Sequence, residues 1–167
     1  MRPDIYKVTQ IGQGFLAVMA EPVAGEWIED EFRGIAQFGI SGMVSLLETH
    51  EVRDLGLLTA PDLCAGNQIK FMHYPIKDRG LPSSFSVTQR LVVQLHDDIL
   101  HGNNNVIHCR AGIGRIGLLA AAVLIRYGLA ANAALAMISK AGAVTVPDTE
   151  EQIDLAEQVS GRIACMK

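Results

Sequence analysis

The sequence predicts one α/β domain whose central mixed, mostly parallel sheet is flanked by helices on both faces. Short apolar segments that suit buried strands alternate with longer segments whose apolar residues recur at helical spacing. No linker, repeat or low-complexity tract divides residues 1–167, so we expect a single domain. The composition, with 49% apolar and 19% charged residues, is typical of a globular protein.

Five segments are predicted to be strands, because each is short, apolar or alternating, and bounded by turn residues. The first two are residues 5–8 and 15–19, and the turn Gly12-Gln13-Gly14 joins them. The other three are residues 43–47, 69–74 and 105–108.

The segments between and after these strands are predicted to be helices. In the first, Trp27, Ile28, Phe32 and Ile35 fall at helical spacing, and Gly39 marks its end. The other expected helices are residues 49–58, 84–101, 116–125, 132–140 and 148–163. Serines at the start of the 84–101 helix suit capping, and the almost unbroken apolar run at 116–125 predicts a buried helix.

Charge and composition exclude several classes of protein. The net charge of −4 argues against a broad nucleic-acid-binding surface. Residues 116–125 form the longest candidate membrane segment, which is too short to span a bilayer. No secretory signal is visible, and the three cysteines have no metal-ligand spacing, which favours free thiols in a reducing compartment. We therefore expect a cytoplasmic monomer that binds neither nucleic acid nor membrane.

The most informative segment is His108-Cys109-Arg110-Ala111-Gly112-Ile113-Gly114-Arg115. It joins a predicted buried strand to a predicted buried helix. Backbone N–H groups in such a loop point inward, and the helix dipole favours negative charge, so the loop can bind an anion. The same field lowers the pKa of a cysteine at its mouth, and the arginine offers a planar fork of donors for two phosphate oxygens. An inert buried cysteine beside a chance arginine is the alternative.

The His-Cys-x5-Arg pattern resembles the signature loop of cysteine-dependent protein tyrosine and dual-specificity phosphatases, in particular the kinase-associated phosphatase-like branch. The resemblance covers about Gly25 to Gln158 and implies that family's α/β fold, with the site at the carboxyl end of the central strand. It implies Cys109 as the nucleophile that forms phosphocysteine and Arg115 as a phosphate ligand. The loop residues implied to bind the substrate are Arg110, Ala111, Gly112, Ile113 and Gly114. No metal or other cofactor is expected, because the arginine, the amides and the helix dipole neutralise the charge.

A second catalytic group is expected on another loop, because the leaving oxygen of a phosphate ester needs a proton. The segment at 74–82 ends a predicted strand and carries Asp78 between two cations. It resembles the general-acid loop of the same family, and Asp78 lies 31 residues before Cys109. We therefore predict Asp78 as acid and then base. Asp54 and Asp62 are the competing carboxylates, and an ordinary turn aspartate is the bland alternative.

Six further residues, among them Lys77 and Arg79 beside Asp78, are expected to have supporting roles. His108 would orient the loop and stabilise the thiolate, or would only pack. Gln152 matches the glutamine that positions water for the second step. Arg110 and the two cations beside Asp78 would form a basic rim, unless they are ordinary solvated charges. Glu48 would hold the fork of Arg115.

One residue departs from the family pattern. Ile116 follows the signature arginine, where most members have a serine or threonine whose hydroxyl stabilises the departing thiolate. We therefore expect phosphocysteine to form normally and to break down slowly. The rival class is a phosphate-binding adaptor or pseudophosphatase, with Ile116 as its mark. A thiol redox protein is a third class, but Cys64 and Cys165 are remote from Cys109 in the sequence.

The expected substrates are phosphorylated proteins, carrying phosphotyrosine and also phosphoserine or phosphothreonine, or another phosphoester. We find no aromatic recognition loop of the kind that deepens the pocket of tyrosine-specific enzymes, so several phosphoesters should fit. A phosphoinositide is less favoured, because Ile113 stands where lipid-cleaving relatives carry a lysine. In every case the site would bind phosphate or another oxyanion.

Overall fold

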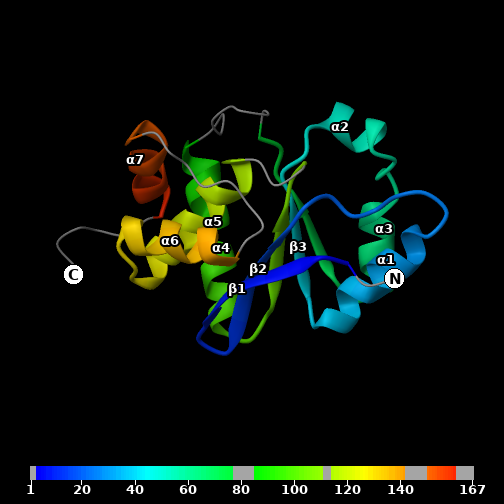
Figure 1. Cartoon of the computed structure of the whole chain (residues 1–167), viewed down its shortest axis with the longest axis horizontal. Coiled ribbons are helices and arrows are strands. Elements are labelled where there is room, and N and C mark those ends of the chain that lie inside the picture. The colour runs from blue at the N-terminus through cyan, green and yellow to red at the C-terminus, as the bar shows by residue number, and fades with distance from the viewer. Residues whose placement is uncertain (1–2, 77–84, 111–113, 142–149, 161–167) are drawn as a thin grey trace.

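The computed structural model describes residues 3–76, 85–110, 114–141 and 150–160, and it is an α/β fold with one five-stranded sheet (Figure 1). The strands are β1 (Ile5–Ile11), β2 (Gly14–Met19), β3 (Gly42–Ser45), β4 (Lys70–His73) and β5 (Asn105–His108). The helices are α1 (Ile28–Phe38), α2 (Thr49–Asp54), α3 (Ala60–Gly66), α4 (Phe85–Leu100), α5 (Gly114–Tyr127), α6 (Ala131–Ala141) and α7 (Glu150–Val159). All five predicted strands are confirmed to within a few residues.

The strand order in the sheet is β1-β2-β5-β3-β4. The β1–β2 hairpin is antiparallel, and the other pairs are parallel. This confirms the predicted mixed, mostly parallel sheet. Strand β5 lies at the centre of the sheet, and all four of its residues are buried, as expected for a strand covered on both faces.

Two hydrophobic layers cover the two faces of the sheet. One contains Ile107 and Cys109 with apolar side chains of α4, α5, α6 and α7, and the other contains Val106 with side chains of α1 and α3. This division follows from the alternation of side chains along a strand. Helix α5 is central in its layer and packs against α4, α6 and α7. Its apolar residues from Ile116 to Ile125 are all buried, as predicted.

Three details differ from the sequence prediction. The helix expected at 49–58 ends at Asp54, because Gly56 has the left-handed φ of 71° that terminates helices. A separate helix, α3, follows and has Pro61 in its first turn. Trp27, predicted on the apolar face of α1, precedes that helix and is 57% exposed. The serine cap expected at residue 84 lies outside the described residues.

Within the described ranges, no helix combines the length and the apolar character that crossing a bilayer requires.

Candidate active site

The carboxyl ends of three parallel strands meet at one edge of the sheet. Ser45 at the end of β3 is the register partner of both His73 on β4 and His108 on β5. The N–H of Leu46 donates to the carbonyl oxygen of His108 at 3.0 Å, which holds β3 and β5 together beyond the last ladder pair. The residue that follows β5, Cys109, is therefore fixed at the centre of this edge.

Cys109 lies between a rigid strand and the start of a buried helix. Its side chain is 0% exposed and belongs to the same hydrophobic layer as Ile107 and Ile116. The thiol donates to the carbonyl oxygen of Arg110, with Sγ and O 3.7 Å apart. Helix α5 begins at Gly114, so its first backbone N–H groups, which have no partner within the helix, lie at the end of the loop that Cys109 begins. The two described ends of this segment, a buried strand and a helix N-terminus, are those of an arrangement suited to anions.

Several predicted site residues cannot be placed relative to Cys109. Asp78 lies outside the described residues, as do Ala111, Gly112 and Ile113. Arg115 lies in the first turn of α5 and Gln152 in α7, but their side chains are not among those described. Arg110 is exposed, as the prediction of a basic rim requires, while its partners in that rim lie in the segment 77–84, outside the description.

The chain that leads to Asp78 runs along the same edge of the sheet. The N–H of Tyr74 donates to the carbonyl oxygen of Ser45 at 2.9 Å, and the N–H of Ile76 donates to that of Leu46 at 3.1 Å. The Tyr74 hydroxyl is also hydrogen-bonded to that of Thr88 on α4, and the side chain of Ile76 is buried. These contacts anchor residues 74–76 beside the end of β3. The neighbouring strand in the sheet is β5, which precedes Cys109.

Glu48 has a local role that the sequence did not suggest. Its side chain accepts from the backbone of Glu51, and the Glu51 carboxylate accepts from the N–H of Glu48 at 2.9 Å, which forms a capping box at the start of α2. His50 lies 3.9 Å from the Glu48 carboxylate. The predicted pair with Arg115 stays a prediction, since that guanidinium is not described.

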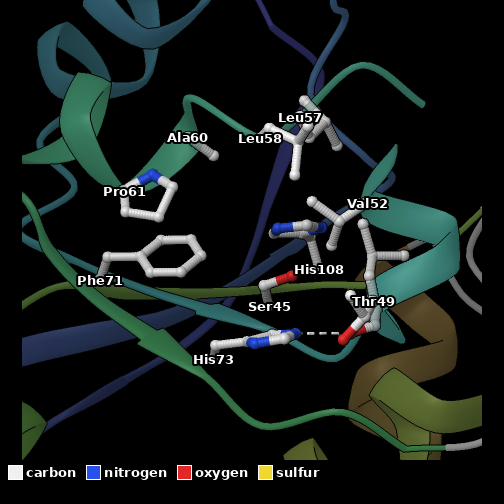
Figure 2. A pocket seen from close by; sticks show the side chains of 11 residues that line it. Ser45, Thr49, Val52, Leu57, Leu58, Ala60, Pro61, Phe71, His73 and His108 are labelled. Carbon is white, nitrogen blue, oxygen red and sulfur yellow. Dashed lines mark hydrogen bonds between the residues drawn. The ribbon is translucent and has the colours of Figure 1, made fainter. Parts of the chain in front are cut away.

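His108 faces away from Cys109, because consecutive strand residues point to opposite faces of the sheet. Its side chain is 1% exposed and lines a cavity together with Ser45 and His73 (Figure 2). Sequence reasoning missed Ser45 and His73. The only signal in the sequence is that each ends an apolar strand, which becomes meaningful once the register is known. Among the described residues, no group of three or more His, Cys, Asp or Glu side chains could hold a metal ion.

A mostly parallel sheet whose central strand ends at a buried cysteine, followed by a helix N-terminus, is the fold that this chain shares with a solved dual-specificity-type phosphatase. The family model described as "Tc-R-P: Polymorphic toxin system, DSP-PTPase phosphatase" matches residues 17–129. The chain belongs to this family, and it is a phosphatase of the tyrosine and dual-specificity type.

Solved structures share this fold. Kinase associated phosphatase superposes with a TM-score of 0.81 at 17% identity, covering 98% of this chain and 99% of that chain. The active form of Tk-PTP gives 0.72 at 24% identity, covering 98% and 100%, and PTPMT1 gives 0.73 at 16% identity, covering 94% of each. A search of curated protein sequences gave no match.

Proposed function

We propose that Cys109 is the nucleophile of this phosphatase and that phosphocysteine is its intermediate. In the first step the thiolate attacks phosphorus, the S–P bond forms and the P–O bond of the ester breaks, while Asp78 gives its proton to the leaving oxygen. In the second step water attacks phosphorus, the Asp78 carboxylate takes its proton, and the thiolate of Cys109 leaves. Arg115 and the loop amides hold the phosphoryl oxygens in both steps.

The position of Cys109 is the observation that supports this mechanism most strongly. The side chain is buried at the end of the central strand, where solvent competes little, and it precedes the N-terminus of α5. An anionic sulfur or phosphoryl group is favoured at such a terminus. The hydrogen bonds that draw residues 74–76 along the end of β3 support delivery of Asp78 to the same edge.

Substitution of the two described cysteines tests this proposal. Cys109→Ser should lower the initial rate of para-nitrophenyl phosphate hydrolysis by at least about a thousandfold, because a serine hydroxyl is hardly ionised there. Cys64→Ala is the matched control, since it also removes a buried thiol, and its rate should stay within about twofold of the parent rate. A Cys109→Ser enzyme that keeps most of the parent activity would overturn the assignment.

The proposed substrates are phosphate monoesters of proteins, with phosphotyrosine first and phosphoserine or phosphothreonine second. The side chain of Arg110 is exposed, and its positive charge favours substrate proteins with negative charge around the phosphorylated residue. PTPMT1, a structural neighbour, has been solved in complex with PI(5)P, so a phosphoinositide belongs in the same assay. We expect kcat/KM for a phosphotyrosine peptide to exceed that for soluble PI(5)P, because Ile113 puts no cation into the loop. The reverse order would make a lipid headgroup the better substrate.

We also propose that the enzyme is a monomer of the cytoplasm. Cys64 and Cys109, the two cysteines in the described ranges, form no disulfide there, as in proteins of a reducing compartment.

A further inference from the structure

A cavity of about 260 Å³ lies beside the end of β5, the strand that precedes Cys109. Ser45 and His108, register partners on β3 and β5, line one side of it. Figure 2 shows both side chains pointing into the space below α2 and the α2–α3 connection. Leu47, between β3 and α2, is one of the apolar residues around it. The others come from α2, the α2–α3 connection, α3 and β4: Val52, Leu57, Leu58, Ala60, Pro61 and Phe71.

The cavity and the thiol of Cys109 are on opposite faces of the sheet. Leu57 and Ala60 belong to the hydrophobic layer that contains Val106, whereas Cys109 belongs to the layer that contains Ile107. A molecule in the cavity therefore meets His108 but is separated from the sulfur by the backbone of β5. This geometry makes the cavity distinct from the anion-binding loop.

The described lining of the cavity carries no Lys, Arg, Asp or Glu side chain, so it offers nothing to balance the charge of a phosphate. Its polar groups are two hydroxyls and two imidazoles, those of Ser45, Thr49, His73 and His108. The Nε2 atom of His73 lies 2.7 Å from the carbonyl oxygen of Leu47. Because a carbonyl oxygen only accepts, Nε2 carries the hydrogen, which leaves Nδ1 as the ring nitrogen that can accept a hydrogen bond.

We propose that this cavity binds a small neutral ligand that is mainly aromatic or aliphatic and donates one hydrogen bond to its polar residues. Apolar walls with a few placed polar groups are characteristic of small-molecule sites. A cavity of about 150 Å³ holds benzene, so this one fits roughly one to two rings. The binding does not depend on the proposed catalytic mechanism, and it is measured without turnover.

Indole and 1-methylindole form a matched pair of probes, since only indole has an N–H donor. Millimolar indole should shift the methyl NMR resonances of Val52, Leu57 and Leu58 and leave those of Leu95 and Val159, in the other hydrophobic layer, in place. Loss of one hydrogen bond should weaken 1-methylindole by about threefold to tenfold. Shifts confined to other methyl groups, or equal binding of the two probes, would overturn the proposal.

Two variants fill the cavity and one removes the acceptor. Ala60→Leu and Val52→Phe should each abolish the indole shifts while the remaining spectrum keeps its native dispersion. Val52→Phe keeps the test available if Ala60→Leu does not fold. His73→Phe should bind both probes equally. Retained binding in a folded cavity-filling variant would overturn the proposed location.

Vanadate, which mimics phosphate, separates this site from the catalytic one. Indole should bind equally well to vanadate-saturated enzyme, and vanadate alone should not shift the Val52, Leu57 and Leu58 methyls. Loss of indole binding in vanadate would show that the cavity is part of the phosphate site and overturn the proposal. If the enzyme is inactive but still binds indole, the proposed function is contradicted and the proposed ligand site is not.

Discussion

Cys64 and Cys109 are buried equally, both at 0% exposure, on opposite faces of one sheet, yet they stand next to different elements of the fold. Cys64 lies in α3 among apolar side chains, with its Sγ 3.8 Å from the Sδ of Met43. Burial there raises the pKa of the thiol from 9.0 to about 12. Cys109 instead precedes the N-terminus of α5, where backbone N–H groups and the helix dipole favour an anion.

The comparison shows that burial alone does not make a cysteine nucleophilic. Desolvation disfavours the thiolate at both positions. At Cys64 nothing in its hydrophobic layer offsets that cost, so the thiol stays neutral and fills space. At Cys109 the proposed mechanism assigns that offset to backbone dipoles and Arg115, which is why the sequence around this residue matters more than its exposure.

The largest expected effect is the difference in reactivity between the two thiols. With a pKa of about 12, Cys64 is thiolate to only about one part in 10⁵ at pH 7. Its thiolate fraction rises as the pH approaches 12, whereas the alkylation of Cys109 should have its midpoint well below about 8.5. At pH 7, iodoacetate should modify Cys109 about 10⁴-fold faster or more, as measured by mass spectrometry of the separate peptides.

Vanadate is the control for that experiment, because it should protect Cys109 and leave the slow reaction of Cys64 unchanged. Similar rates at the two residues, or a midpoint for Cys109 near that of a free cysteine, would remove the basis of the comparison.

Asp78→Asn should have the next largest effect, and it acts on the leaving group rather than on the thiol. We expect turnover of alkyl phosphates to fall by about 10²–10⁴-fold, because no proton reaches the leaving oxygen. The loss should be smaller for an activated aryl phosphate. The alkylation profile of Cys109 should not move, which separates this variant from one that disturbs the loop.

Asp62→Asn on α3 is the matched control for Asp78, as the competing carboxylate in the sequence. Stopped assays with an alkyl and an aryl phosphate are sufficient. If Asp62→Asn lost activity and Asp78→Asn did not, the assignment of Asp78 as the general acid would be wrong.

The sequence predicted well what contiguous residues determine. The buried strand Asn105–His108 has its predicted bounds, because four buried residues leave little choice of conformation. The break between α2 and α3 was missed, because the apolar spacing continues across Gly56 while its left-handed φ ends the helix. The exposure of the Trp27 side chain was not predicted, because the spacing of apolar residues does not show what covers the end of a helix.

The segment Cys109–Arg115, which we propose binds the phosphoryl group, could be singled out from the sequence because its chemistry needs adjacent residues. The cavity beside it could not, because Ser45, His73 and His108 come together only through strand register. Residues distant in sequence meet there after three strands have paired. The same limit applies to Asp78, whose spacing to Cys109 is suggestive but does not fix where its carboxylate lies.

The smallest expected effect concerns Ile116, which lies in the first turn of α5 and shares its hydrophobic layer with Cys109. Threonine and valine have nearly the same shape, so Ile116→Thr and Ile116→Val differ mainly in one hydroxyl. Trimming a buried isoleucine to valine costs about 0.5–1.5 kcal/mol of stability, and this should be the only consequence of Ile116→Val. The steady-state rate of the valine variant should match that of the parent.

Ile116→Thr should instead speed the breakdown of phosphocysteine, because its hydroxyl can donate to the departing thiolate. A hydrogen bond to a charged group is worth about 1.5–3 kcal/mol, and about 1.4 kcal/mol corresponds to a factor of ten. The steady-state rate with an activated aryl phosphate should therefore rise by roughly tenfold to a hundredfold. Stopped-flow traces of the parent should show a burst near one leaving group per enzyme, and this burst should shrink in Ile116→Thr. If the parent shows no burst and the two variants turn over equally, Ile116 only packs the start of α5 and the second step is not slow. If no variant shows turnover that depends on Cys109, the loop would have to bind phosphate without cleaving it.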